Sequence, residues 1–386
     1  MRDWKVAIVK DSSKSMFGLH GLHTAFRGIP NVQVVAHVDS NIDNLEQKLA
    51  QTQAQRHYMT CREMLEHESP DIVVVTSRHP GDHMKQIRMI AQKGCHIYCE
   101  KPVSDSLEEA DEIDRIATEN CIKIGMAHPS RHDLGFLTMK RMIEAGEIGT
   151  PLTVVGRGKC DHRGGGEDLI VLGSHILDLQ TYFFGAPESV MANIRIAGRL
   201  AEQSDVAETT EPIGPALGDE IFAVFQLKNG VRSIFESHRG LYQPEQSVPH
   251  MGIRVMGTQG VLSMRFDDGG CQPLLISHQR CFPEDNPDFT EVPLQENRNI
   301  PGALPLDYTL CGQAGVPHAT WFLEANRFAV WDLMRAIEEN REPIANLADA
   351  RVTLEMIYGI YAAHLSRRTV TFPLMNRAHP LADKAK

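Results

Sequence analysis

Short apolar segments that alternate with helical patterns fill the first third of the chain and limit the folds it can adopt. The segments are rich in Val and Ile and carry apolar residues on both faces. Such runs are typical of a parallel sheet covered by helices on each side. The alternation therefore predicts a doubly wound α/β domain. We expect its strands at residues 6–9, 32–39, 71–75, 96–99 and 121–125, and its helices at 19–26, 44–52, 81–93 and 107–119.

The rest of the chain has a different pattern, in which strands are joined by tight turns and followed by long helices. Asn229-Gly230 between two strand-like runs indicates a hairpin with a type I′ turn. These features predict an α+β domain with an antiparallel sheet. Its strands are expected at 152–158, 189–196, 221–227, 231–237, 253–257, 261–265 and 370–373, and its helices at 173–184, 319–338 and 346–365. We expect a dinucleotide-binding domain over 1–127, a substrate and oligomerisation domain over 128–376, and a mobile tail over 377–386.

Charge and cysteine content narrow the classes of partner. The 386 residues include 39 Lys and Arg against 50 Asp and Glu, a formal net charge of −11. An acidic balance disfavours nucleic acid and anionic membrane surfaces as partners, because both require basic faces. No apolar run approaches the roughly 20 residues of a spanning helix. The eight cysteines are scattered without a Cys-x-x-Cys pair, which favours reduced thiols, and with no secretory signal in view we expect a cytoplasmic protein.

Two features near the first strands predict a dinucleotide site. Ser13-x-Ser15-x-x-Gly18 has the spacing of the glycine-rich phosphate loop, although serine replaces the first two glycines. Asp39 ends the second expected strand, where an acidic residue binds the adenosine ribose hydroxyls and repels a 2′-phosphate. We therefore expect Ser13, Ser15, Gly18 and Asp39 to bind the cofactor, and NAD to be favoured over NADP. An ordinary serine-rich turn remains the alternative for the loop.

The segment 94–102 ends in Glu100-Lys101-Pro102 and resembles the signature of the Gfo/Idh/MocA oxidoreductase family, which includes glucose–fructose oxidoreductase and inositol dehydrogenase. Segments 76–83, 164–178, 256–260 and 346–374 resemble further family motifs in the same order. The resemblance implies a Rossmann domain followed by an α+β domain with a large open, mainly antiparallel sheet. It also implies a homodimer or homotetramer formed through that sheet. One departure is Val171, which stands where the family usually carries an aspartate four residues before a histidine.

The resemblance also implies roles for individual residues. Lys101 and His175 would be catalytic, and Glu100 would brace the nicotinamide ribose or Lys101. A loop beside the nicotinamide half would contain Thr76, Ser77, His79 and His83. The expected substrate residues are Arg131, Asp161, His162 and Asp178, and Glu167 and Asp168 are candidates to replace the carboxylate absent at Val171. A solvated loop is an equal alternative for residues 161–163, and no metal site is expected, since the histidines near the substrate lack ligand spacing.

These residues suit the oxidation of a secondary alcohol, which needs a hydride acceptor and a base for the hydroxyl proton. A histidine titrates near neutrality, so His175 would be the base, while Lys101 would stabilise charge on the reacting oxygen. We expect an NAD-dependent oxidoreductase acting on a sugar, cyclitol or related polyol. One alternative is a lyase, epimerase or glycosidase that oxidises sugar C3 transiently with tightly bound NAD. A second alternative is a non-catalytic family member.

Overall fold

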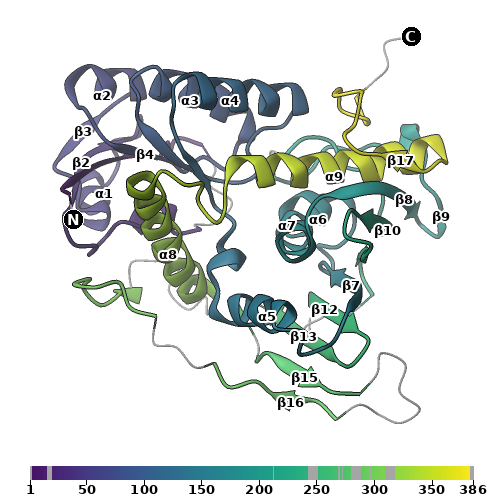
Figure 1. Ribbon diagram of the computed structural model, residues 1–386. Coiled ribbons are helices and arrows are strands. Elements are labelled where there is room, and N and C mark those ends of the chain that lie inside the picture. The colour runs from purple at the N-terminus through teal and green to yellow at the C-terminus, as the bar shows by residue number, and fades with distance from the viewer. Residues whose placement is uncertain are drawn as a thin grey trace. The chain divides into compact units, whose positions relative to one another are not determined.

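The chain folds into two compact units (Figure 1). The computed structural model describes residues 2–14, 20–211, 213–241, 251–267, 270–271, 273–279, 288–294, 298–308 and 318–382. The first unit is Met1–His132 with Asn297–Ala350, and the second is Asp133–Glu296 with Arg351–Lys386. The expectation of one domain over 128–376 does not include the return of residues 297–350 to the first unit.

A six-stranded parallel sheet forms the first unit, in the order β3-β2-β1-β4-β5-β6. The order reverses between β1 and β4, so the carboxyl ends of these strands form the switch point at which such sheets bind nucleotides. This confirms the predicted doubly wound fold. The strand bounds are β1 Trp4–Val9, β2 Val32–Val38, β3 Arg56–Tyr58, β4 Ile72–Val75, β5 His96–Cys99 and β6 Ile124–Met126.

Helices cover both faces of this sheet (Figure 1). The returning helix α8 packs Val330, Leu333 and Met334 in one buried cluster with Trp4 and Ile8 of β1. The other helices are α1 Leu45–Thr52, α2 Cys61–His67, α3 His83–Ala91, α4 Leu107–Glu119 and α8 His318–Glu339, with 3-10 turns η1 Leu22–Thr24, η2 Pro80–Asp82 and η3 Pro129–His132. Of the helix expected at 19–26, the described part contains only η1.

The second unit contains a larger, mixed sheet in the order β16-β15-β13-β12-β7-β11-β10-β8-β17, with β14 beside β13 and β9 beside β8. Strands β7 and β11 are parallel, and the other pairs are antiparallel. This confirms the mainly antiparallel sheet. The bounds are β7 Pro151–Arg157, β8 Pro187–Ile196, β9 Arg199–Leu200, β10 Glu220–Leu227, β11 Arg232–His238, β12 Gly252–Gly257, β13 Val261–Asp267, β14 Gly270–Cys271, β15 Leu275–Ser277, β16 Thr290–Glu291 and β17 Val370–Thr371.

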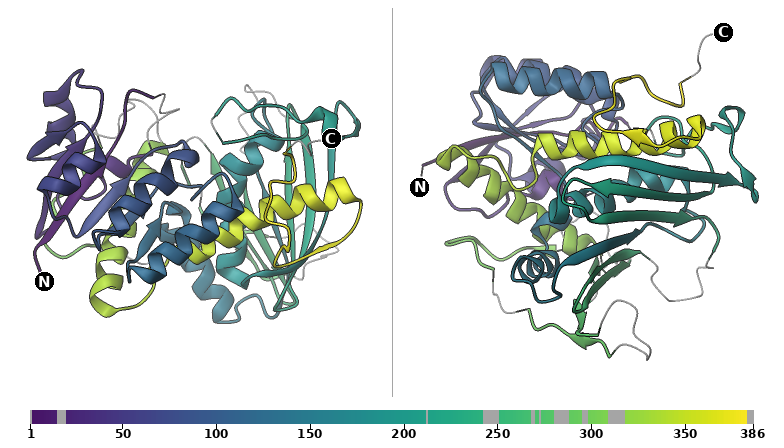
Figure 2. Two further views of the ribbon diagram at one scale, coloured as in Figure 1. Left: turned by 90° about the horizontal axis from the view of Figure 1, so that it is seen from above. Right: turned by 45° about the vertical axis from the view of Figure 1, so that its right-hand side comes forward.

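Helices α7 and α9 pack on this sheet (Figures 1 and 2). Gly156 of β7 makes a close approach possible, because a Cβ there would lie 2.2 Å from Ile176 of α7. Gln180 of α7 also donates from Nε2 to the carbonyl of Ile234, at 2.7 Å. Leu381 is buried in the same core, within the segment expected as a tail. The helices are α5 Leu134–Glu144, α6 Gly166–Val171, α7 Gly173–Phe184 and α9 Leu347–Ser366, with η4 Gln203–Asp205.

One local expectation is wrong. The β10–β11 turn has positive φ at Gly230 but not at Asn229, so it is not the type I′ turn, which needs positive φ at both residues. The Asn229 side chain instead accepts a hydrogen bond from the backbone of Val231. Helix α4 is capped by Ser106, which accepts from the Glu109 backbone.

Candidate functional site

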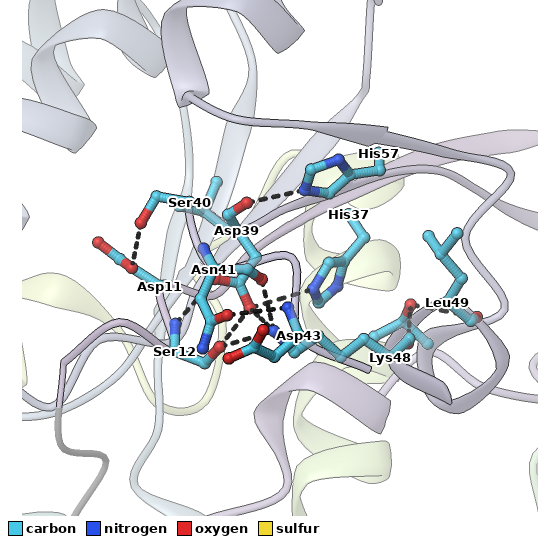
Figure 3. Close-up of polar contacts among 12 residues, drawn as sticks. Asp11, Ser12, His37, Asp39, Ser40, Asn41, Asp43, Lys48, Leu49 and His57 are labelled. Atoms are coloured by element: carbon cyan, nitrogen blue, oxygen red, sulfur yellow. Dashed lines mark hydrogen bonds and ion pairs between the residues drawn. The ribbon is translucent and has the colours of Figure 1, made fainter. Parts of the chain in front are cut away.

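The carboxylate of Asp39, directly after β2, collects donors from three segments of the first unit (Figure 3). Its Oδ1 accepts from the backbone of Ser12 at 3.0 Å and of Asn41 at 2.9 Å. Its Oδ2 accepts from Ser12 Oγ at 2.7 Å and pairs with Lys48 Nζ at 3.0 Å. His37 Nε2 lies 3.7 Å from the same oxygen. Asp39 is 1% exposed, so these contacts form a buried anionic centre at the carboxyl edge of the sheet.

The donors decide the charge of this carboxylate. Burial alone raises the pKa of an acid, because water no longer stabilises its charged form. The hydrogen bonds from Ser12 and Asn41, with the nearby Lys48 and His37 side chains, outweigh burial here and hold the pKa of Asp39 well below its usual range. Asp39 is therefore ionised at neutral pH and able to accept hydrogen bonds from hydroxyl groups.

The loop after β1 is only partly described. Ser13 donates from Oγ to Asp11 Oδ1 at 2.5 Å, and Ser40 donates to the same oxygen at 2.9 Å. The hydroxyl expected to meet phosphate is therefore bonded to an acid in this structure. Ser15 and Gly18 lie outside the described residues, so the predicted phosphate spacing stays a prediction.

The residues expected beside the nicotinamide form most of their contacts with backbone groups. Thr76 donates from Oγ1 to the carbonyl of Val9, and the Ser77 hydroxyl contacts Asp82 and the backbone of His79. The fully buried His83 lies close to two backbone carbonyls. Its Nδ1 lies 3.0 Å from the carbonyl of Val103 and its Nε2 lies 2.8 Å from the carbonyl of Ser77.

His83 therefore ties the loop after β4 to the loop after β5. Both of its nitrogens face backbone oxygens, and the side chain is fully buried. This arrangement suits a residue that shapes the two loops more than one that contacts a ligand directly. The cofactor-binding role of His83 stays a prediction.

Glu100 forms a second buried anionic centre, beside Lys101. Its Oε1 accepts from the backbone of Lys101 and its Oε2 lies 2.9 Å from His20 Nδ1. Phe322 of α8 stacks on His20, and Asn326 of α8 donates to the His20 carbonyl. Burial raises the pKa of Glu100, but His20 and the cations nearby lower it further, so it is held below its usual range. Lys101 is 5% exposed and joined to Pro102 by a cis peptide bond.

Arg131 is bonded within the first unit. Its Nη1 donates to Asp349 at 2.6 Å and to the carbonyl of Ile344 at 2.9 Å. The guanidinium is 3% exposed and links η3 to the start of α9. Its contact with substrate stays a prediction.

In the second unit, His175 and Asp178 lie three residues apart on α7 and so share one face of that helix. His175 is 6% exposed and Asp178 is fully buried. Lys101 and His175 belong to different units, and each is described within its own.

Asp168 and Glu167, the two candidates for the carboxylate absent at Val171, both accept hydrogen bonds from other groups. Asp168 Oδ2 accepts from the backbone of Lys159 at 2.8 Å and from Ser237 Oγ at 2.9 Å. Its Oδ1 has no hydrogen-bond partner among the described residues and lies 3.9 Å from Lys159 Nζ. Burial raises the pKa of Asp168 against the lowering by Lys159 and Ser237. Glu167 Oε1 accepts from the backbone of Glu211.

The cluster at 161–163 is held together internally. Arg163 donates from its backbone and its guanidinium to the Asp161 carboxylate, and these contacts lower the pKa of Asp161 although burial raises it. The His162 side chain is 74% exposed. Among the described residues, no three His, Cys, Asp or Glu side chains could hold a metal ion together. In that same part of the chain, no helix is long and apolar enough to cross a membrane.

Sequence reasoning missed the partners of these two carboxylates, among them Ser12, Lys48 and His20. Lys48 carries the clearest signal, because it follows Asp39 by nine residues on an expected helix. Ser12 and His20 lie in loops, so their contacts depend on the folded backbone and have no spacing rule.

Comparisons with known proteins agree with this architecture. A family model described as an oxidoreductase family with an NAD-binding Rossmann fold matches residues 16–128. A model of the Gfo/Idh/MocA C-terminal domain matches residues 136–263. Similar proteins include scyllo-inositol 2-dehydrogenase (NADP(+)) IolW of Bacillus subtilis, 30% identical over 37% of this chain and 43% of that protein. D-glucoside 3-dehydrogenase of Escherichia coli is 25% identical over 56% of this chain and 66% of that protein.

The match to IolW therefore spans less than half of that relative's length. Among solved structures, levoglucosan dehydrogenase in complex with NADH and L-sorbose has a TM-score of 0.72 at 17% identity and covers 97% of this chain and 100% of that one. The WlbA dehydrogenase of Bordetella pertussis, in complex with NADH and UDP-GlcNAcA, has a TM-score of 0.67 at 18% identity, over 97% and 99% of the two chains. At such identities these likenesses show the fold alone. Because the two family models together match more than half of the sequence, the chain belongs to the Gfo/Idh/MocA oxidoreductase family.

Proposed function

We propose that this protein oxidises a secondary hydroxyl of a sugar, cyclitol or related polyol with NAD, and that Lys101 and His175 handle the hydroxyl proton. The observation that carries the proposal is the pair of ionised, buried carboxylates, Asp39 and Glu100, in a Rossmann unit of an oxidoreductase family. Glu100 bonds the backbone of Lys101 and so fixes the lysine's attachment point.

The residues of the first unit fit a dinucleotide. Asp39 follows a strand beside the switch point and presents a carboxylate that is charged at neutral pH. Such a group would accept hydrogen bonds from the adenosine ribose hydroxyls. When bound, the dinucleotide would supply the hydride acceptor. The charge on Asp39 would disfavour a 2′-phosphate, which supports NAD as the cofactor.

The chain's own residues would manage the proton and the substrate. The Lys101 ammonium would donate a hydrogen bond to the reacting oxygen and stabilise the charge that develops there. The His175 imidazole would accept the hydroxyl proton, and Asp178, on the same helix face, would orient the imidazole or bind substrate. Val171 supplies no carboxylate to this helix end, so His175 works without the family's usual aspartate.

The test is direct. Purified protein is titrated with NAD⁺ by calorimetry and assayed against a polyol panel by absorbance of NADH. We expect NAD⁺ binding, turnover with at least one polyol, and a loss of turnover of at least 100-fold in Lys101→Met and in His175→Asn, with NAD⁺ affinity retained in His175→Asn. An exposed lysine variant, Lys93→Met, is the matched control. Failure to bind any nicotinamide dinucleotide would overturn the proposal, and binding without turnover on any substrate would favour a non-catalytic family member.

A second candidate uses the same site for transient oxidation at sugar C3, followed by elimination or epimerisation. The feature in its favour is Val171, which departs from the family pattern, together with similarity to an enzyme named for 3-oxidation of D-glucosides. Oxidation at C3 acidifies the adjacent C–H, and the hydride returns at the end of the cycle. Glycoside cleavage without net NADH would support this reading, and stoichiometric NADH without cleavage would exclude it.

We also propose that the protein assembles as a homodimer or homotetramer through the open sheet of the second unit. Mass photometry tests this proposal, and a monomer at micromolar concentration would contradict it.

A further inference from the structure

We propose that Lys48 determines how strongly the protein discriminates between NAD⁺ and NADP⁺. This inference rests on the proposed function, because it concerns the site at which Asp39 would meet the adenosine ribose. It modifies the simple reading of Asp39, in which the acid alone excludes a 2′-phosphate.

The acceptor capacity of Asp39 is already used within the chain (Figure 3). A carboxylate has about four lone-pair sites on its two oxygens. The backbones of Ser12 and Asn41 take two of them on Oδ1, and Ser12 Oγ and Lys48 Nζ take the two on Oδ2. A ribose hydroxyl must therefore replace one of these donors.

The two oxygens differ in what can be replaced. The donors on Oδ1 are backbone groups of the loops after β1 and β2, so removing them would require the loops to move. The donors on Oδ2 are a hydroxyl and an ammonium, which exchange by rotation of side chains. Ribose hydroxyls would therefore enter at Oδ2, the side of the carboxylate on which Lys48 lies.

Lys48 would stay beside Oδ2 after such an exchange. Its Nζ also donates to the carbonyl of Asn41 at 2.5 Å and to Ser12 Oγ at 2.9 Å. Its side chain is 13% exposed, so solvent screens its charge only in part. The ammonium thus keeps two anchors when it loses one, and it remains next to the ribose.

The charges at this edge make Lys48 decisive. Asp39 carries negative charge at the proposed ribose site and would repel the dianionic 2′-phosphate of NADP⁺. Lys10 also interacts with Asp39 and has its pKa lowered by burial, whereas the Lys48 ammonium lies 3.0 Å from the carboxylate. Lys48 is the cation in contact with Oδ2, so it offsets the repulsion and leaves NADP⁺ binding measurable.

The experiment compares dissociation constants of NAD⁺ and NADP⁺ by calorimetry, in the full chain without substrate. The quantity of interest is the ratio of the NADP⁺ constant to the NAD⁺ constant. Loss of the positive charge that pairs with Asp39 is expected to raise this ratio at least tenfold in Lys48→Met. Lys48→Arg keeps the charge and is expected to stay within about threefold of the wild-type ratio. Lys93→Met, an exposed lysine of the same unit, is the control for overall charge.

Each outcome separates this inference from the proposed function. NAD⁺ binding with an unchanged ratio in Lys48→Met would overturn the role of Lys48 and leave the oxidoreductase intact. A ratio that shifts equally in Lys48→Met and Lys93→Met would also overturn it, because the effect would then follow net charge. Absence of binding for both dinucleotides in the wild type would overturn the proposed function itself. Thermal unfolding of each variant with and without NAD⁺ gives a second readout, since a misfolded variant would lose both ligands.

Discussion

Two buried aspartates, Asp39 in the first unit and Asp168 in the second, are equally hidden from solvent and differ in charge behaviour. Each is 1% exposed. Asp39 has donors on both oxygens, including an ammonium at 3.0 Å, and its pKa is lowered. Asp168 has donors on Oδ2 alone, with the Lys159 ammonium at 3.9 Å from Oδ1, and its pKa is raised. Burial raises the pKa of both carboxyl groups; the donors outweigh it at Asp39 and do not at Asp168.

The difference also separates two uses of a buried carboxyl group. Asp39 is a permanent anion at a sheet edge, which suits the recognition of hydroxyl groups. Asp168 joins the ends of β7 and β11, since its Oδ2 bonds both Lys159 and Ser237. These bonds suit a residue that holds the two strand ends together.

The largest expected effect lies in ligand binding. Asp39→Ala would remove the two charge-assisted hydrogen bonds that we propose to the ribose, each contributing about 1.5 kcal/mol, so NAD⁺ affinity should fall roughly 100-fold. Calorimetry of Asp39→Ala and Asp168→Asn gives the comparison, because Asp168 lies in the other unit. Equal losses in the two variants would remove the distinction between recognition and clamping.

Replacing each acid by its amide tests the donor argument through stability. Asp39→Asn places an NH₂ group against existing donors and should lower the free energy of unfolding by about 2–4 kcal/mol. Asp168→Asn should cost less than about 1 kcal/mol, because the amide oxygen can occupy the Oδ2 position and the NH₂ group the Oδ1 position, where no hydrogen bond is lost. Thermal unfolding of both variants measures the difference, with the exposed Asp43→Asn as control. A greater loss in Asp168→Asn would contradict the comparison.

Removing one hydroxyl donor from each carboxylate should lower the free energy of unfolding by a smaller amount. Here the loss should be greater at Asp168 than at Asp39. Ser237→Ala takes one of two donors from Asp168 and should cost about 1–2 kcal/mol. Ser12→Ala takes one of four donors from Asp39, whose backbone and lysine donors remain, and should cost about 0.5–1 kcal/mol. Chemical denaturation measures the free energy of unfolding of both variants. A greater loss in Ser12→Ala than in Ser237→Ala would contradict the argument from donor number.

The smallest effect concerns acid. The folded pKa of Asp39 lies below its unfolded value of about 3.9, so its stabilisation is present above that pH and is lost as the pH falls through the folded pKa. The folded pKa of Asp168 lies above that value, so its contribution is present below about pH 4 and is lost as the pH rises through the folded pKa. The melting temperature of the wild-type protein is therefore measured from about pH 3 to 6. On acidification it should approach the melting temperature of Asp39→Asn, and as the pH rises it should fall relative to that of Asp168→Asn. Parallel curves for all three proteins would contradict the opposite shifts.

Much of the fold could be predicted from the sequence, because many segments carry the apolar pattern of their own secondary structure. The period of apolar residues gave helices 107–119 and 173–184 with the bounds observed for α4 and α7. Strand β3 was missed because Arg56–Tyr58 has no apolar run and forms only by pairing with β2. The apolar stripe of α8 predicts a buried face, but no local signal says which sheet that face covers.

The candidate site divides in the same way. Asp39 was identified because its position depends on the end of one strand. Its partner Ser12 lies 27 residues earlier, and their contact follows from a loop conformation that no spacing rule encodes. His83 had been expected to bind cofactor from its place in a family-like loop, whereas its two backbone contacts are visible only once the loops after β4 and β5 are folded.

The return of residues 297–350 has a consequence for how this protein is made. Val330, Leu333 and Met334 of α8 cover apolar side chains of β1 that would otherwise face water. During synthesis, one face of the amino-terminal sheet therefore stays uncovered until well over half of the polypeptide has been made. A nascent chain released early would present an open apolar surface, so a chaperone that holds unfinished sheets is expected to engage this protein for as long as the ribosome has not passed residue 350.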